Sequence, residues 1–599
     1  MALPESSHGS DRSQPHSDQG DQNNQDERDE QLDSAQASDK NLNCEPEAVP
    51  IDPVDPASEP DQGKANARRS LFSIAGIVAL ATLLSKVFGL FRQMAIAAAF
   101  GVGAAVDAYN YAYVVPGFLL VLLGGINGPF HSAIVSVLSK RNQKEAAPLV
   151  ETITTLVAGA LLLVSIALVF FAQPMIDLVA PGLAGSPEGM EIRAIAVQQL
   201  RIMAPMAVLA GLIGIGFGTL NASNQYWLPS VSPMFSSLAV LLAIGFFALA
   251  PGGEVGSNAY AVRGGMILAW GTLAGAIFQW LAQISAQWRS GMGSLRLRFN
   301  FRLPGVRQIL KIMLPATFSS GLLHINVYTD LFFASYIPQA AAALGYAQLL
   351  VQTPLGLLSN IILVPLLPVF CRLTEPEDWD ELKVRIRQGM MLTAIAMLPL
   401  SALIMTLALP AVRLVYERFA FDQSASRLVA SVLVAYGAGM FVYLGRDVMV
   451  RVFYALGDGS TPFKVSMVGV GLNALFDYIF VQQFGAPGLA LSTAGVNLFS
   501  LIALVWLLDR KLNGLGWQSW MKPLLGITVI SAIAGATSWG VLWGIAQLWQ
   551  SDGALIQIVQ LALAGGGGLL VFGLLIVRLR LPEVDRAWRM IKQKLPVFR

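Results

Sequence analysis

The chain has 599 residues, of which 54% are hydrophobic and 13% are charged, and its mean hydropathy is +0.57. A soluble chain would carry about 25% charged residues, so this composition excludes a soluble protein and indicates one that crosses a membrane many times. The two cysteines, Cys44 and Cys371, lie too far apart in sequence to indicate a disulfide framework or a zinc site.

The first 69 residues differ in composition from the rest. They hold 16 acidic and 6 basic residues, which leaves 22 acidic and 34 basic residues, a net charge of +12, for residues 70–599. Because 1–69 has too few apolar residues to build a core, we expect a disordered acidic cytoplasmic tail there. It lacks the basic start and apolar stretch of a signal peptide. A solvated tether and a tail that binds a partner protein both agree with this composition.

Apolar stretches of about 20 residues, the length that spans a bilayer, recur along the rest of the chain. We therefore expect an all-α polytopic membrane protein with about fourteen transmembrane helices. The expected spans lie near 71–99, 105–126, 148–172, 193–219, 230–250, 262–286, 306–336, 339–371, 387–409, 427–455, 463–483, 487–508, 521–548 and 554–579. Residues 127–139 should continue the second span or lie at the interface.

Basic residues gather in alternate loops, after the second, sixth, eighth and twelfth spans, and in a basic tail at 581–599. The intervening loops have almost none, apart from Arg413 and Arg418. Basic loops face the cytoplasm, so both termini are expected to be cytoplasmic, in agreement with an even number of spans.

Two pairs of segments indicate an internal repeat. LNASNQYWLPSVSPM (220–234) resembles YALGDGSTPFKVSM (454–467), and AAVDAYNYAYVVPGFLL (104–120) resembles AAALGYAQLLVQTPLGLL (341–358). Both pairs are six spans apart. We therefore expect two pseudo-symmetric six-helix lobes, at 70–290 and 300–510, and two additional helices at 519–580. Paired bundles of this kind are typical of transporters, whose substrate site lies between the halves.

Ionisable residues within spans are unfavourable unless they face a cavity or a partner, so they are the functional candidates. Cations outnumber anions among them, which suits an anionic cargo that carries phosphate. The candidates for cargo binding are Lys86, Arg92, Asp107, Arg201 and Arg451. For Arg92 and Arg201, the alternative is a side chain that extends to the membrane interface. His324, in the seventh span, is either a core histidine or a proton relay.

A second set of polar residues could supply oxygen ligands. Asn326 and Asp330 share a face of the seventh span, Asn473 and Asp477 share a face of the eleventh, and Thr493 lies in the twelfth. The oxygens of Asp330, Asn473, Asp477 and Thr493 suit a small hard cation such as Na⁺ better than a transition metal. A proton shared by the two carboxylates and a structural hydrogen-bond cluster are the alternatives.

The chain shows no motif of an enzyme. GDGS (457–460), GAGM (437–440) and GGGG (565–568) are not phosphate-binding loops between a strand and a helix. No nucleophile is paired with a base, and the P-loop of an ATP-driven pump is missing. We therefore expect no enzyme, no cofactor other than a coupling Na⁺, and no nucleic-acid partner.

Three segments resemble a known family. They are SKVFGLFRQMAIAAAFGVGAAVDAYNYAYVVP (85–116), INVYTDLFFASYIPQAAAALGYAQLLVQTPLGLLSNIILVPLLPVF (325–370) and RVFYALGDGSTPFKVS (451–466). They resemble spans 1 and 2, spans 7 and 8, and the junction of spans 10 and 11 of the MurJ (MviN) lipid II flippases. This family belongs to the multidrug/oligosaccharidyl-lipid/polysaccharide exporter superfamily. The likeness extends over residues 70–579 with the same number of spans.

The resemblance implies two six-helix lobes in a V, with the helices of 519–580 forming a groove for a lipid tail. The implied cargo is lipid II, the undecaprenyl-pyrophosphate-linked disaccharide pentapeptide, carried across the bacterial inner membrane by alternating access. Cell-wall synthesis proteins are the implied partners. The family's span 1 arginines correspond to Lys86 and Arg92, and its sodium site corresponds to Asp330, Asn473, Asp477 and Thr493.

The sequence also departs from the family. The family's span 2 arginines would fall in GFLLVLLGGINGPF (117–130), which has none, its span 8 arginine falls at Leu349, and an acidic residue is replaced by Gln93. Either other arginines compensate, with Arg201, Arg446 and Arg451 as candidates, or the cargo is different. The alternatives are a flippase for another lipid-linked glycan, an ion-coupled small-molecule exporter, and a scaffold that recruits cell-wall proteins through its acidic tail.

Overall fold

The computed structural model describes residues 62–125, 128–139, 141–249, 257–300, 302–322, 325–548 and 553–584. These residues form helices and no strand, which confirms the predicted all-α fold. Residues 1–61 of the acidic tail, His324 and the basic tail from residue 585 lie outside the described residues. Residues 62–69, predicted to belong to the disordered tail, instead begin the first helix, where Lys, Ala and Arg are good helix formers.

The described residues of the first half form ten α-helices and a short 3-10 helix. They are α2 (Gln62–Phe100), α3 (Ala104–Gly124), α4 (Pro129–Leu138), α5 (Gln143–Phe170), α6 (Ala172–Val179), η1 (Pro181–Gly185), α7 (Pro187–Met203), α8 (Met206–Ala222), α9 (Trp227–Val231), α10 (Pro233–Leu249) and α11 (Asn258–Arg289). The expected span 193–219 falls on α7 and α8, which meet at a bend of 44°. Pro205, which has no N–H to donate, lies between them.

The second half contains the remaining helices. They are α12 (Pro304–Leu322), α13 (Ile325–Ala334), α14 (Ala340–Cys371), η2 (Pro376–Asp378), α15 (Trp379–Thr406), α16 (Ala408–Tyr416), α17 (Gln423–Ala455), α18 (Ser460–Phe484), α19 (Ala486–Lys511), α20 (Gln518–Leu548), α21 (Ala554–Ile576) and η3 (Val577–Leu579). Of the described helices, 12 are long and apolar enough to cross a membrane, or 13 if α7 and α8 form one span. The remaining expected span, 306–336, falls on α12 and α13.

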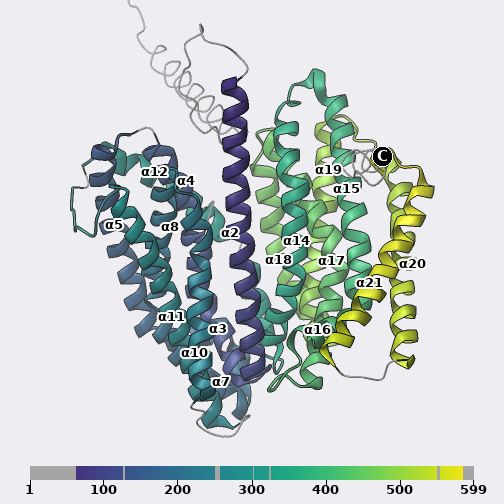
Figure 1. Cartoon of the computed structure of the whole chain (residues 1–599), viewed down its shortest axis with the longest axis horizontal. Coiled ribbons are helices and arrows are strands. Elements are labelled where there is room, and N and C mark those ends of the chain that lie inside the picture. The colour runs from purple at the N-terminus through teal and green to yellow at the C-terminus, as the bar shows by residue number, and fades with distance from the viewer. Residues whose placement is uncertain are drawn as a thin grey trace, which may run out of the picture.

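The helix packing repeats between the halves, as the two segment pairs predicted. In the first lobe, α3 packs on α7 and α8, α5 packs on α8, and α11 packs on α8 and α10. Six spans later, α14 packs on α17, α15 packs on α17, and α19 packs on α17 and α18. The additional helices α20 and α21 pack on each other and on α15, at the far side of the second lobe (Figure 1).

The helix α12 packs with the first lobe, although the sequence repeat groups it with the second. Its buried Val306, Ile309 and Met313 share a core with Ile134 of α4 and Leu149 of α5. The next helix, α13, packs on α18 and α19 of the second lobe. The predicted lobe boundary near residue 300 therefore differs from the packing, in which the chain passes between lobes from α12 to α13.

The two lobes are joined at one end of the bundle, where α3 begins and α13 ends. Hydrogen bonds between described residues connect them, among them Ala342 N to Asp107 Oδ1 at 2.8 Å, Tyr346 Oη to the Gly101 carbonyl at 2.9 Å, Gly182 N to Ser335 Oγ at 2.9 Å and Ala420 N to the Ala98 carbonyl at 3.1 Å. We call this set of contacts the clasp. From the clasp, the lobes diverge on either side of α2, towards the end that holds α4, α12, α15 and α19 (Figure 1).

Close backbone contact and aromatic packing support the clasp. Gly101 has a φ of +58°, and a Cβ there would clash with the carbonyl oxygen of Ala420 in the second lobe. Only glycine combines this φ with so close an approach. Behind it, the rings of Tyr346, Tyr416 and Phe421 pack with centroids 5.0–5.6 Å apart. The apolar core is continuous between the lobes at this end.

Candidate functional site

The four residues predicted to supply oxygen ligands lie together where α13, α18 and α19 meet. Asn473 Nδ2 donates to Asp330 Oδ1 and to Asp477 Oδ2, at 2.8 Å in each case. Thr493 Oγ1 donates to Asp330 Oδ2 at 3.3 Å. We call Asp330, Asn473, Asp477 and Thr493 the acidic cluster. Their predicted proximity is confirmed, whereas their role as ion ligands stays a prediction.

Two buried oxygen atoms of the acidic cluster have no hydrogen-bond donor. Asn473 and Asp477 are both 0% exposed. Asn473 Oδ1 and Asp477 Oδ1 are buried without a partner. A buried acceptor left unpaired is unfavourable by about 1–3 kcal/mol. The cluster thus combines two carboxylates with free amide and carboxylate oxygens, a donor set that fits a hard cation such as Na⁺.

A cap at the start of α18 fixes this helix against α19. Thr461 N donates to Asp458 Oδ1 at 3.0 Å, and Lys511 Nζ, at the end of α19, donates to Asp458 Oδ2 at 2.7 Å. Partial burial acts to raise the pKa of Asp458, but the hydrogen bonds from Lys511 and Thr461 overcome it and lower the pKa to about 2. This contact sets the register of the two helices that carry three of the four cluster residues.

Two of the predicted cargo residues lie on α2, between the lobes (Figure 1). Lys86 is exposed, and a Cβ added at Gly356 of α14 would lie 3.4 Å from its Nζ. Arg92 Nε is buried without a hydrogen-bond partner. The Arg92 guanidinium lies within electrostatic range of the hydroxyls of Tyr109 and Tyr113 on α3.

The other three predicted cargo residues are dispersed. Asp107 is 3% exposed, and its carboxylate accepts the Ala342 N–H in the clasp, so it is engaged between the lobes. Arg201 is exposed near the end of α7. Arg451 Nη1 donates to the Leu363 carbonyl of α14 at 3.2 Å. The described contacts therefore do not bring the five cargo candidates into one cluster.

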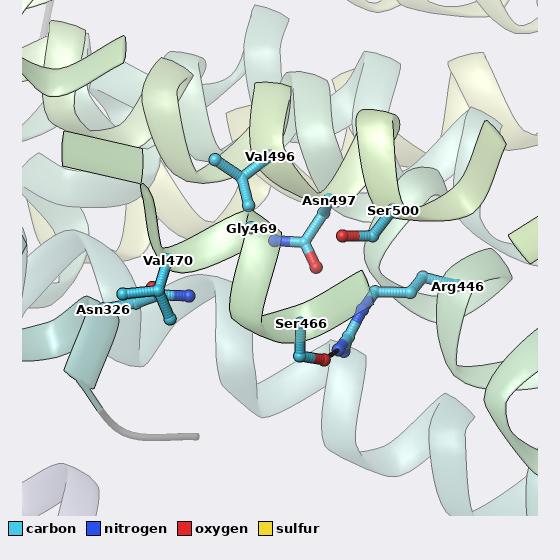
Figure 2. A pocket seen from close by; sticks show the side chains of 8 residues that line it. All are labelled: Asn326, Arg446, Ser466, Gly469, Val470, Val496, Asn497 and Ser500. Carbon is cyan, nitrogen blue, oxygen red and sulfur yellow. Dashed lines mark hydrogen bonds between the residues drawn. The ribbon is translucent and has the colours of Figure 1, made fainter. Parts of the chain in front are cut away.

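Sequence reasoning missed a polar pocket next to the acidic cluster. Its volume is about 170 Å³, and it is lined by Asn326, Arg446, Ser466, Gly469, Val470, Val496, Asn497 and Ser500 (Figure 2). Arg446 Nη2 donates to Ser466 Oγ at 3.0 Å. The lining comes from α13, α17, α18 and α19, so only the packing of these helices assembles it. The sequence feature that could have indicated this pocket is the spacing of four residues between Asn326 and Asp330, and between Thr493 and Asn497, which places each pair on one helix face.

The described residues form twelve or thirteen candidate spans in two lobes of repeated packing. Within the second lobe, Asp330 lies beside the fully buried Asp477. These features define a polytopic membrane protein of the transporter class. The family model described as lipid II flippase MurJ matches residues 96–563. The chain therefore belongs to the MurJ family, as the sequence resemblance predicted.

Relatives and solved structures agree with this assignment. A protein of Synechocystis sp., described as a probable lipid II flippase MurJ, is 56% identical over 532 residues, which are 88% of this chain and 98% of the relative. The lipid II flippase MurJ of Burkholderia cenocepacia is 29% identical over 488 residues, 79% of this chain and 90% of the relative.

The structural similarities establish the fold. A lipid II flippase MurJ in an inward closed conformation has a TM-score of 0.66 and 21% identity, and the match covers 84% of this chain and 99% of that one. An inward-facing multidrug resistance transporter of the MATE family has a TM-score of 0.53 and 15% identity, over 74% of this chain and 98% of that one.

Proposed function

We propose that this chain is a flippase that moves lipid II from the cytoplasmic to the outer leaflet of a bacterial inner membrane. The observation that carries the proposal is the 56% identity to the Synechocystis protein over 98% of that protein's length. The distribution of basic loops supports cytoplasmic termini. With this orientation, the clasp lies at the outer face, and the lobes diverge towards the cytoplasm (Figure 1).

In this orientation, the basic residues of α2 are placed to receive an anionic head group from the cytoplasmic side. The Arg92 guanidinium can bind pyrophosphate oxygens through two parallel hydrogen bonds, and its Nε has no competing partner. Lys86, exposed beside α14, supplies a second positive charge. Release to the outer leaflet then requires the clasp to open, which separates Gly182 from Ser335 and Asp107 from Ala342.

The acidic cluster supplies the coupling site in this proposal. A bound Na⁺ would balance the negative charge of the Asp330 and Asp477 carboxylates. Asp330 lies on α13 only five residues before Ser335, which belongs to the clasp. The position of α13 therefore affects both the acidic cluster and the clasp. A cation shifts the balance between clasped and open states only as far as its affinity for them differs.

A second candidate is a flippase for another lipid-linked glycan. It is favoured by the absence of arginine from 117–130 and by Leu349, because both remove positive charge that the family provides for its cargo. Depletion of the protein in its own host, followed by identification of the accumulating lipid-linked precursor, separates the two. We expect lipid II to accumulate and cells to lyse. Normal lipid II with another polyprenyl-linked sugar accumulating would replace the first proposal with the second.

The remaining alternative is a scaffold that acts through the acidic tail. Removal of residues 1–61 leaves every described helix intact. We expect this truncated chain to support growth of the depleted host, because the groups proposed to bind cargo and cation lie within the helical part. Loss of growth, with normal amounts of the truncated protein in the membrane, would favour the scaffold.

A further inference from the structure

The polar pocket is the next layer of the same helix seam that holds the acidic cluster. On each of three helices, a pocket residue lies four positions from a cluster residue: Asn326 and Asp330 on α13, Gly469 and Asn473 on α18, and Asn497 and Thr493 on α19. Four residues advance a helix by about 6 Å and return to the same face. The pocket and the cluster are therefore adjacent layers.

The pocket lies on the side of the cluster that faces away from the clasp. The helix α13 ends beside Ser335 in the clasp, so Asn326 is farther from the clasp than Asp330. The two layers are linked directly, because Asn497 Nδ2 donates to the Thr493 carbonyl at 2.7 Å. In the proposed orientation, the pocket thus separates the acidic cluster from the cytoplasm.

The lining of the pocket suits water and a hydrated ion. A volume of about 170 Å³ is well above the roughly 15 Å³ that one water molecule needs. Asn326 Oδ1 is buried without a hydrogen-bond partner, and Figure 2 shows the Asn497 amide and the Ser500 hydroxyl close together. These neutral groups can replace part of a cation's hydration shell.

The lining also contains one charged side chain, Arg446. Its guanidinium donates to Ser466 and, at 3.4 Å, to Asp447 Oδ1, which lies outside the pocket. Ser466 precedes Asn473 by seven residues on α18, which corresponds to about 10 Å along the helix. At that separation, a positive charge weakens cation binding by roughly three- to tenfold, since Asp447 offsets part of it.

We propose that this pocket is the hydrated path between the acidic cluster and the cytoplasm. In this proposal, the positive charge of Arg446 keeps Na⁺ binding at the acidic cluster weak enough for release. The inference rests on the proposed cation coupling. Na⁺ leaves the cluster through the layer of Asn326, Asn497 and Ser500. The Arg446 charge repels the Na⁺ electrostatically, without direct contact.

The first experiment measures binding of ²²Na⁺ to the purified full chain at constant ionic strength, with choline replacing Na⁺. Arg446→Gln should tighten binding by roughly three- to tenfold, and Arg446→Lys, which keeps the charge, should stay close to the wild type. Arg427→Gln, an exposed arginine on the same helix α17, is the matched control and should change nothing.

The outcomes distinguish the role of Arg446 from the cation coupling on which that role depends. If the wild type binds Na⁺ and Arg446→Gln binds it with unchanged affinity, the role of Arg446 is refuted and the coupling site stands. If Arg446→Lys behaves like Arg446→Gln, the side chain acts through its shape, which also refutes the proposal. If the wild type binds no Na⁺, the cation coupling itself fails.

A second experiment tests the path without a bound cation. In a chain with Cys44→Ser and Cys371→Ser, Ser500→Cys should react with membrane-impermeant thiol reagents added from the cytoplasmic side. The anionic reagent should react faster than the cationic one, and Arg446→Gln should remove this preference. A thiol that reacts only after denaturation would show that the pocket is closed to water and would overturn the path.

Discussion

The clasp gives a prediction whose magnitude follows from the contact between Gly182 and Ser335. A Cβ added at Gly182 would lie 2.6 Å from the carbonyl carbon and oxygen of Ser335, whereas ordinary contacts begin near 3.4 Å. In Gly182→Ala, the two lobes must therefore separate by about 0.8 Å at this point, because both sides of the contact are backbone. The hydrogen bond from Gly182 N to Ser335 Oγ, now 2.9 Å, would then exceed the hydrogen-bonding range.

The expected change in the conformational equilibrium is large. Overpacking of a close contact is unfavourable by about 1–3 kcal/mol, and the lost hydrogen bond contributes about 0.5–1.5 kcal/mol. Together they disfavour the clasped state by roughly 2–4 kcal/mol, which is a shift of about thirtyfold to several hundredfold. A protein that is about 99% clasped would become at least about one-fifth open.

The chain offers a closely matched control. Gly185 lies in the same 3-10 helix, and a Cβ there meets nothing within 4 Å, so Gly185→Ala should leave the clasp intact. Spin labels at Met190 and Phe419, which are exposed in the two lobes, report the separation by double electron–electron resonance. Gly182→Ala should add a population at longer distance. Identical distance distributions for Gly182→Ala and Gly185→Ala would refute the reasoning.

Three further predictions concern the site and its support. Asp330→Asn should remove the stabilisation by Na⁺ in thermal unfolding, because one carboxylate of the acidic cluster is lost; a full Na⁺ effect in this variant would exclude Asp330 as a ligand. Arg92→Ala should abolish growth of the depleted host at normal membrane levels, since it removes the charge proposed to bind pyrophosphate; unimpaired growth would remove Arg92 from the mechanism. Asp458 has its pKa lowered from 3.8 to about 2, so its stabilising contribution is present above pH 3.8 and is lost as the pH falls towards 2. Asp458→Asn should be less stable at pH 7 and should lose less stability on acidification than the wild type, and parallel pH curves for the two proteins would show that the Lys511 contact is unimportant.

The local pattern of the sequence was sufficient to predict the helices and part of the candidate site. Apolar runs long enough to span a bilayer predicted the fold, because a membrane leaves the backbone few alternatives to a helix. The two residues that are four apart on α18, Asn473 and Asp477, had to share a face wherever that helix packed. Asp330 could be added because a carboxylate is rare within a span unless it meets a partner. Thr493 was added as a further oxygen ligand in the next span.

Contacts between distant helices were decided only by the tertiary structure. The predicted cargo contact of Asp107 stays a prediction, but its carboxylate also accepts an N–H from Ala342, 235 residues away, which the sequence did not predict. Nothing in the local sequence distinguishes a carboxylate that binds cargo from one that joins two lobes. In the same way, Arg446 became part of a pocket only when four helices packed around it.

The packing of the seventh span shows the same limit of local sequence patterns. Its hydropathy predicts one helix at 306–336, and the sequence repeat assigns that helix to the second lobe. The described parts on either side of residues 323–324 pack differently: the apolar face of α12 packs in the first lobe, whereas α13 carries Asp330 to α18 and α19. Hydropathy determines that a segment lies in the membrane, but the shapes of the surrounding helices determine which lobe it stabilises. That choice depends on close packing between residues far apart in the chain, which no local pattern encodes.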